Sequence, residues 1–258
     1  MLFAEITAKD NPRIKHIIKL QKSAHFRYAE GLFVLEGLRT VDDATANSVK
    51  LKEFYVTKEA YDKHPSDIKK FAHSADFTAI ISDVIAKSIS DTVTTQGIFA
   101  VAKIPDEKVE LCKNKKYIAL ENLQDPSNLG AVARTAEALG IDGIILSLDS
   151  CDPFSPKALR ASMGTLLRLP LIFTSDMTEF LRGCGMKTYA CVVHTSAKKL
   201  TEISFNDGCI CVIGNEANGL KEDTVAVCSD SITIPMNGLA ESLNAAAAAS
   251  IVMWEMVK

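Results

Sequence analysis

The sequence lacks the patterns that identify membrane, secreted and zinc-binding proteins. Its 258 residues contain no run of about 18 uncharged apolar residues and no basic-then-apolar segment after Met1, so we expect neither a membrane span nor a secretory signal. The 7 cysteines are an odd number, with no Cys-x-x-Cys pair and no histidine at zinc-site spacing. We therefore expect reduced thiols, a cytoplasmic location and no metal site.

Nucleotide-binding loops are absent as well. The sequence has no G-x-G-x-x-G and no glycine-rich loop followed by Lys-Ser/Thr, which removes the main support for ATP, GTP or dinucleotide binding. The net charge of -3 argues against a chain that coats nucleic acid through bulk charge, but it allows a local basic face. With 47% hydrophobic residues, the chain can bury a large core and is long enough for two domains.

A local basic face is predicted near the N-terminus. Asn11 and Pro12 favour a helix start, and apolar residues at helical spacing follow them. The outer face of this helix and its flanks can contact phosphates, although a solvated surface explains the same charges. The basic residues of this segment, which outnumber the acidic ones, are Lys9, Arg13, Lys15, Lys19, Lys22 and Arg27.

Strand and helix patterns alternate along the rest of the chain. A charged, aperiodic linker at 106–116 separates a small α/β domain at 1–105 from a second domain at 117–258. In the second domain, continuous apolar strands alternate with helices, which predicts a parallel sheet covered on both faces. The elements expected in the first domain are strands at 32–36, 51–56 and 95–104 and helices at 37–46 and 58–72.

The first of three polar loops in the second domain lies in "ENLQDPSNLGAVARTAEALG", residues 121–140. Asn128 is a good helix cap, and Gly140 is a good helix end. Small residues one turn before Arg134 leave space beside its guanidinium for a planar anionic group. A surface ion pair between Arg134 and Glu137 would explain this arginine equally well.

The second polar loop is "VIGNEANGL", residues 212–220. It places Gly214 where a backbone must approach a ligand, and the acidic residue Glu216 follows just beyond the glycine. A plain turn between a strand and a helix would give the same pattern.

The third polar loop follows a strand at 231–235 and precedes the C-terminal helix. Pro235 ends the strand, and Ser242 or Asn244 is expected to cap the helix. Five consecutive alanines, Ala245–Ala249, give that helix a thin flank that another backbone can approach closely. Because ligands bind where strand ends meet helix starts in α/β sheets, this loop indicates a binding site. A helix that merely closes the domain is the alternative.

Together, the three loops resemble the three sequence motifs of the SpoU (TrmH) family of RNA ribose 2′-O-methyltransferases, in the SPOUT superfamily. This resemblance implies an α/β fold with a SPOUT-type parallel sheet and a C-terminal trefoil knot, which binds S-adenosylmethionine and forms a homodimer. Topology rules alone would argue against a knot. The N-terminal unit resembles an L30e-like RNA substrate-binding domain through "FVLEGLRTV" and "TQGIFAVA". Its basic residues are therefore expected to contact RNA.

The same resemblance implies roles for individual residues. Arg134 is expected to reach the target nucleotide, with Asn128 and Glu216 fixing its side chain. Ser242 and Asn244 are expected to organise the loop around ribose and cofactor. Since a guanidinium stays protonated, we expect Arg134 to orient ribose or phosphate, and the general base is unassigned. The residues expected to contact the cofactor, largely through backbone groups, are Val193, His194, Thr195, Gly214, Ile234, Met236 and Leu243, with a structural or solvent-facing role for the histidine.

The resemblance predicts an S-adenosylmethionine-dependent RNA 2′-O-ribose methyltransferase that acts on ribosomal RNA. No metal is expected, because the leaving group is neutral. Transfer RNA is an alternative substrate, but the extra N-terminal unit fits a bulkier target better. A non-catalytic RNA-binding or ribosome-assembly protein with the same fold is a further alternative, and the complete set of polar motif residues argues against it.

Overall fold

The computed structural model describes residues 3–105 and 109–258. Part of the expected linker, residues 106–108, lies outside the described residues. No helix in the described ranges is long and apolar enough to cross a membrane. The chain packs into two units, in which unit 1 holds Met1–Asp106 and Phe154–Arg168, and unit 2 holds Glu107–Pro153 and Leu169–Lys258.

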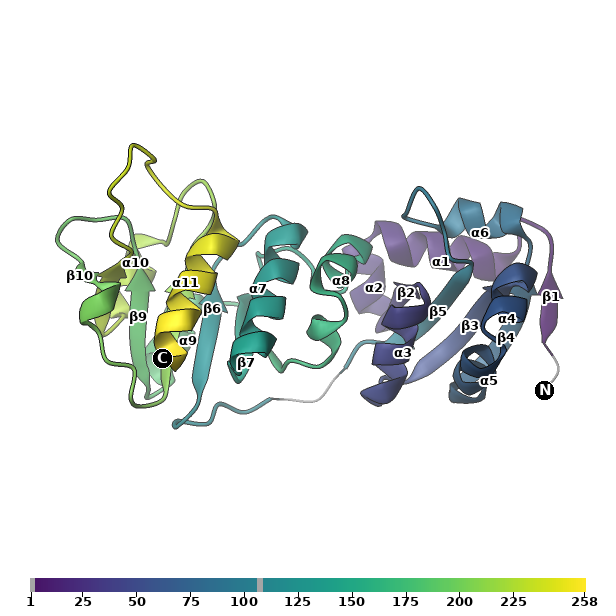
Figure 1. Ribbon diagram of the computed structural model, residues 1–258, viewed down its shortest axis with the longest axis horizontal. Helices are drawn as coiled ribbons and strands as arrows, with labels where there is room; N and C mark the ends of the chain where they lie inside the picture. The colour runs from purple at the N-terminus through teal and green to yellow at the C-terminus, as the bar shows by residue number, and fades with distance from the viewer. Residues whose placement is uncertain (1–2, 106–108) are drawn as a thin grey trace. The chain divides into compact units, whose positions relative to one another are not determined.

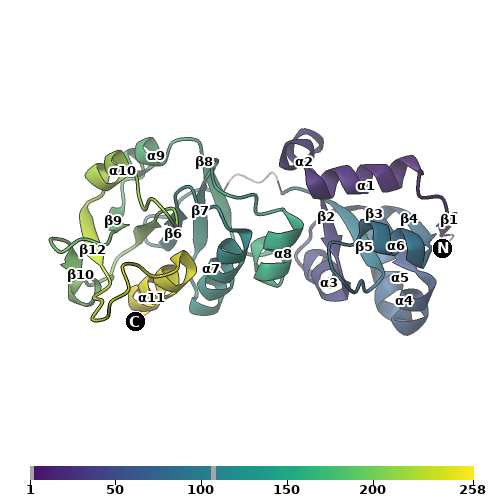
Figure 2. The same ribbon diagram turned by 90° about the horizontal axis from the view of Figure 1, so that it is seen from above.

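Unit 1 consists of a mixed sheet and the helices that cover it (Figure 1). Its strands are β1 (Ala4–Ile6), β2 (Leu32–Glu36), β3 (Leu51–Thr57), β4 (Ala75–Ile81) and β5 (Ile98–Lys103). Its helices are α1 (Pro12–Lys22), α2 (Ala24–Glu30), α3 (Leu38–Ala46), α4 (Lys58–Lys63), α5 (Pro65–Ser74), α6 (Asp83–Ile89), α8 (Pro156–Ser162) and the short η1 (Thr165–Leu167). The strand order is β1-β4-β3-β5-β2, and β5 runs antiparallel to β2 and β3. Figure 2 shows α1 on one face of this sheet and α3 and α5 on the other.

The first helix of unit 1 begins where the sequence predicts. Asn11 caps α1 because its side chain accepts a 2.9 Å hydrogen bond from the backbone N–H of Arg13. Ile14, Ile17 and Leu20 are fully buried, so one apolar stripe of α1 anchors it to the core. The remaining faces of the helix carry its lysines.

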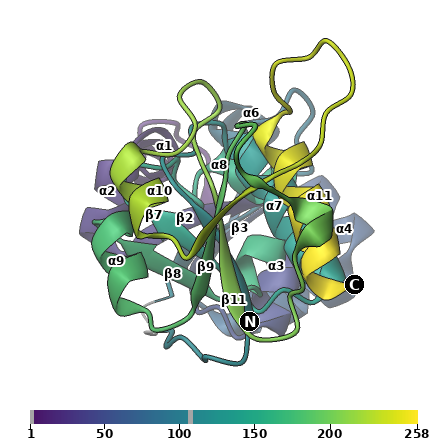
Figure 3. The same cartoon turned by 90° about the vertical axis from the view of Figure 1, so that its left-hand side faces the viewer.

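Unit 2 is a seven-stranded sheet in which every neighbouring pair is parallel. Its strands are β6 (Lys116–Leu120), β7 (Gly143–Ser147), β8 (Leu171–Thr174), β9 (Lys187–Cys191), β10 (Lys198–Lys199), β11 (Cys209–Ile213) and β12 (Asp230–Thr233), in the order β10-β12-β9-β11-β6-β7-β8. Its helices are α7 (Pro126–Leu139), α9 (Met177–Gly183), α10 (Glu222–Val227), α11 (Ala245–Val257) and the short η2 (Leu200–Glu202). Figure 3 shows α9 and α10 on one face and α7 and α11 on the other. The predicted α/β fold with a covered parallel sheet is confirmed.

The start of α7 differs from the prediction. Asp125 caps this helix by accepting a 2.9 Å hydrogen bond from the backbone N–H of Ser127, and Pro126 is its first residue. Asn128 therefore lies inside the first turn, where only 8% of it is exposed, and it does not cap the helix. Its amide is free to bond to other loops. Gly140 ends α7 at φ 73°, as expected.

The C-terminal helix α11 packs along α7 (Figure 2). Ala245, Ala246 and Ala249 are buried, which agrees with the thin flank predicted from the alanine run. The hydroxyl groups of Thr135 on α7 and Ser250 on α11 lie 3.2 Å apart at hydrogen-bonding distance. This packing holds the start of α11 beside the loop that precedes α7.

Candidate active site

The three polar loops meet at one edge of the sheet of unit 2. Because β6, β11 and β12 are all part of one parallel sheet, their carboxyl ends point the same way. The loops after them span residues 121–125, 214–221 and 234–244. This edge is the usual ligand-binding edge of an α/β sheet.

Hydrogen bonds between three side chains tie these loops together. The Oε1 atom of Glu216 accepts a 2.9 Å hydrogen bond from Nδ2 of Asn128. In turn, Oδ1 of Asn128 accepts a 3.0 Å hydrogen bond from Nδ2 of Asn244. Asn244 also caps α11, since its Oδ1 atom accepts from the backbone N–H groups of Ala246 and Ala247. We call Asn128, Glu216 and Asn244 the loop bridge, because Asn128 lies in the first turn of α7, directly after the first loop, and the other two belong to the second and third loops.

Glu216 is the charged member of the loop bridge. It also accepts hydrogen bonds from the backbone N–H groups of Gln124 at 3.1 Å and Asp125 at 3.2 Å. Partial burial opposes its ionisation, but the hydrogen bond from Asn128 and these backbone hydrogen bonds outweigh burial, so the pKa of Glu216 is lowered. An ionised Glu216 therefore fixes the loop that leads into α7.

Arg134 lies apart from the loop bridge. Its side chain is exposed on α7 and has no hydrogen bond or ion pair to any residue in the described ranges. Six residues separate it from Asn128, about one and two-thirds helical turns, so the two side chains leave α7 on different sides. The expected fixing of Arg134 by Asn128 and Glu216 is therefore not formed within one copy of the chain.

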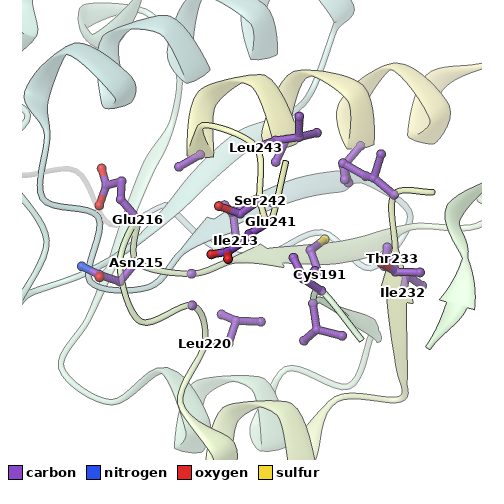
Figure 4. Close-up of a pocket in the computed structure, with 18 of the residues that line it drawn as sticks. Cys191, Ile213, Asn215, Glu216, Leu220, Ile232, Thr233, Glu241, Ser242 and Leu243 are labelled. Atoms are coloured by element: carbon purple, nitrogen blue, oxygen red, sulfur yellow. The ribbon is translucent and has the colours of Figure 1, made fainter. Parts of the chain in front are cut away.

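A cavity of about 490 Å³ lies beside the loop bridge (Figure 4). It is lined by residues from each of the three loops that follow β9, β11 and β12. His194 and Thr195 do not line it, although they were expected to contact the cofactor. His194 is exposed, and its Nδ1 atom lies 2.7 Å from the hydroxyl of Ser196, which agrees with the solvent-facing role expected for it. The expected cofactor-contacting residues that do line the cavity are Val193, Gly214, Ile234, Met236 and Leu243.

Gly214 is required for a different reason from the one expected. A Cβ atom at this position would lie 2.2 Å from the carbonyl carbon of Gly219, so the close neighbour is the chain's own backbone. Backbone hydrogen bonds of 2.9 Å between Asn215 and Gly219 close this loop in both directions. The glycine therefore shapes the cavity wall by allowing the loop to fold back on itself.

Other residues of the cavity were not predicted. Cys191, Asn215 and Glu241 line it together with Ser242, and Figure 4 draws them around the same space. Asn215 positions its loop, because its Nδ2 atom donates a 2.8 Å hydrogen bond to the backbone carbonyl of Asn122. Glu241 could have been predicted from the sequence, because it directly precedes Ser242 in the same polar loop.

Comparison with known proteins places this geometry in a family. The model of the SpoU rRNA methylase family matches residues 115–254. The chain belongs to the SpoU rRNA methylase family. This confirms the resemblance found in the three loops. A model of the MRM3-like substrate binding domain matches residues 11–100, in the N-terminal part of the chain.

Several rRNA methyltransferases resemble the chain over nearly its whole length. The 23S rRNA (guanosine(2553)-2′-O)-methyltransferase RlmP of Bacillus subtilis is 28% identical over 254 residues, which cover 98% of each chain. The 23S rRNA (uridine(2479)-2′-O)-methyltransferase of Streptomyces viridochromogenes is 24% identical over 96% of this chain and 90% of its own length. The AdoMet-bound rRNA methyltransferase of Sinorhizobium meliloti has a TM-score of 0.87 and 26% identity, covering 98% of this chain and 97% of that one.

Proposed function

We propose that this protein is an S-adenosylmethionine-dependent RNA 2′-O-ribose methyltransferase that acts on ribosomal RNA. The observation that carries the proposal is the loop bridge, which joins the three SpoU motif loops beside a cavity at the ligand-binding edge of the sheet. Two of the relatives that match over the full length are named as 23S rRNA 2′-O-methyltransferases, and these names favour ribosomal over transfer RNA as the substrate.

The cavity fits the cofactor. Its volume of about 490 Å³ lies within the range of about 300–1,000 Å³ common for small-molecule sites. Apolar side chains that include Leu200, Ile213 and Val252 provide walls for an aromatic base, and the loops offer backbone polar groups and carboxylates for the remainder. When bound, S-adenosylmethionine supplies an electrophilic methyl group.

The residues of this chain then have positioning roles. A ribose 2′-hydroxyl is a weak nucleophile at neutral pH, so transfer depends on in-line placement and on removal of one proton. The loop bridge holds the rim of the cavity in one geometry, and Ser242 lines the cavity close to it. Arg134 orients the ribose or phosphate of the target nucleotide through its permanently charged guanidinium.

A homodimer completes this proposal. The outer face of α11 carries an apolar stripe of Ala247, Ile251 and Trp254, of which the tryptophan is 59% exposed. A second copy packed on this stripe would shield it from water. Arg134 is exposed on the neighbouring helix and does not line its own cavity, so the dimer also gives it a route to the site of the other copy. The C-terminal trefoil knot belongs to the same proposal, and the return of the chain from β12 across to α7 supports it.

The N-terminal domain, residues 1–105, is proposed to bind the RNA, with 106–116 as a linker to the methyltransferase domain at 117–258. Lys15, Lys19 and Lys22 share one face of α1 at helical spacing, and all three are exposed, as is Lys9. Arg13 is less available than these lysines because it pairs with Glu53 and stacks over Phe77 at 3.9 Å.

Arg27 does not belong to this basic face. It is only 4% exposed, and its Nη1 atom donates hydrogen bonds to the backbone carbonyls of Leu20 at 2.5 Å and Gln21 at 3.0 Å. Its charge therefore stabilises the C-terminal end of α1. The expected phosphate contact from Arg27 is corrected to this structural role. All seven cysteines carry free thiols, which supports a cytoplasmic location as part of the proposal.

Ribose-methylation mapping of total RNA from cells with and without the protein tests the substrate. We expect one ribosomal RNA site to lose its methyl group, whereas loss of a transfer RNA site would redirect the proposal and no lost site would refute it. Purified Arg134→Ala should lose methyl transfer to that RNA while keeping its affinity for S-adenosylmethionine in calorimetry. Equal loss of both would contradict the assigned role of the arginine.

A further inference from the structure

Glu241 is a carboxylate of the cavity without a partner in the chain. It lies in the loop before α11, lines the cavity and is exposed to it (Figure 4). Within residues 3–105 and 109–258, it has no hydrogen bond or ion pair. Its charge is therefore free to respond to a ligand.

The charges around the cavity have one sign. Among its described lining residues, the only ionic side chains are Glu216 and Glu241, and no Lys, Arg or His joins them. Glu216 is already engaged by hydrogen bonds from Asn128 and from two backbone N–H groups. Glu241 is thus the carboxylate left to interact with a positive charge in the cavity.

The two ligands of a methyltransferase differ by one such charge. S-adenosylmethionine carries a sulfonium, an ammonium and a carboxylate, so its net charge is positive. After transfer the bond between methyl carbon and sulfur is broken, its electron pair stays on sulfur, and S-adenosylhomocysteine is left as a thioether without net charge. A negative cavity wall therefore favours the methyl donor over the product.

We propose that Glu241 is a specificity-determining residue that makes the cavity prefer the cationic methyl donor to its neutral product. The inference rests on the proposed function, because it takes the cavity to be the cofactor site. Its benefit to the reaction is release of the product after each turnover, since the attraction for the sulfonium ends when the methyl group leaves.

The expected difference in affinity depends on how exposed Glu241 is to water. Opposite unit charges about 4 Å apart in surroundings close to water attract by about 1 kcal/mol, which corresponds to roughly a fivefold change in affinity. Partial exclusion of water by the bound ligand would increase this factor. We therefore expect a preference of roughly fivefold or more from this one carboxylate.

Isothermal titration calorimetry of the full chain tests the inference. In Glu241→Gln, the affinity for S-adenosylmethionine should fall by roughly fivefold, whereas the affinity for S-adenosylhomocysteine should be unchanged. A donor analogue with a protonated amine in place of the sulfonium should lose affinity as S-adenosylmethionine does. The matched control is Glu222→Gln, which removes an exposed carboxylate of α10 that does not line the cavity and should leave both affinities as they are.

Equal changes for donor and product, or no change for either, would overturn the inference. A second measurement needs no substitution: the ratio of the two affinities of the unaltered protein should fall as salt is raised, because salt screens an exposed charge. A ratio independent of salt would also overturn it. Failure of the unaltered protein to bind either ligand would refute the proposed function itself, and the inference with it, so the two failures are distinguishable.

Discussion

Glu216→Gln gives the sharpest test of the loop bridge. Oε1 of Glu216 accepts hydrogen bonds from Asn128 and from the backbone of Asp125, and Oε2 accepts one from the backbone of Gln124. Glutamine has the same shape but only one acceptor oxygen. Whichever oxygen the amide nitrogen replaces, a donor then faces another donor, so at least one hydrogen bond is lost.

The expected cost is modest because the carboxylate is partly exposed. A hydrogen bond to a charged acceptor contributes about 1.5–3 kcal/mol when it is sheltered from water, and less at the surface. We therefore expect the free energy of unfolding of Glu216→Gln to be lower by roughly 1–2 kcal/mol at pH 7. Glu222→Gln should change it by less than about 0.5 kcal/mol, as is usual for exposed sites without specific contacts.

The difference should depend on pH with a defined sign. Burial opposes the ionised form of Glu216, but the hydrogen bonds prevail and lower its pKa from the ordinary value of 4.5. A lowered pKa means that the ionised group stabilises the fold above pH 4.5 and that this contribution is lost as the pH falls through the lowered value. The difference in free energy of unfolding between the unaltered protein and Glu216→Gln, which we call the gap, should therefore be largest at pH 7 and disappear in acid.

Urea unfolding at a series of pH values measures this gap. The fluorescence of Trp254, the single tryptophan of the sequence, reports on unit 2, and circular dichroism reports on the whole chain. A gap that stays constant from pH 7 into acid would show that the substitution acts through packing. No gap at any pH would refute the claim that the carboxylate holds the three loops together.

Two further predictions concern α11. Asn244→Ala removes both the helix cap and the hydrogen bond to Asn128, so we expect a loss of roughly 1–2 kcal/mol in urea unfolding, which Asn244→Ser should partly restore because serine can cap the helix. Trp254→Glu places a charge in the apolar stripe and should convert the proposed dimer to monomer in sedimentation velocity, while Glu255→Gln on the same helix should not; an unchanged dimer would show that the stripe is not the interface.

In the sheet of unit 2, strands with a clear apolar run were predictable, and β8 and β10 were not. β6 and β11 lie in continuous apolar runs, the pattern that predicts a parallel sheet, and β12 overlaps the strand expected at 231–235. β8 has only four residues and β10 only two, so pairing with their neighbours, not a local pattern, makes them strands. β4 was missed because it follows α5 directly, without a turn residue between them.

Prolines start and end helices as expected, but the positions of these boundaries were not always predicted. The expected helix at 58–72 is divided into α4 and α5 because Pro65 cannot continue a helix and instead starts a new one. Similarly, Asp125 followed by Pro126 is a cap and first-residue signal that competes with the cap predicted at Asn128. Because Asp125 caps the helix, Asn128 lies within its first turn, where its side chain can bond to the other loops.

The sequence named residues that the structure brings together, but it did not predict the contacts between them. The motif resemblance named Asn128, Glu216 and Asn244, and the structure joins all three. It did not foresee that the two asparagines bond to each other, or that Arg134 lies outside the bridge. A single sequence does not give the distance between residues of separate loops. Only the packing of α11 on α7 shows which side-chain amides contact each other.

The two carboxylates of the cavity are expected to have different roles, one in the stability of the fold and the other in the preference for one ligand. Glu216 is engaged by the chain, so its loss should lower stability, whereas Glu241 has no partner in the described ranges and its loss should leave urea unfolding unchanged. Conversely, Glu241→Gln should alter the ratio of donor to product affinity at full stability. A Glu241→Gln protein that both unfolds earlier and loses affinity for the two ligands equally would mean that this carboxylate shapes the loop and does not sense the charge of the ligand.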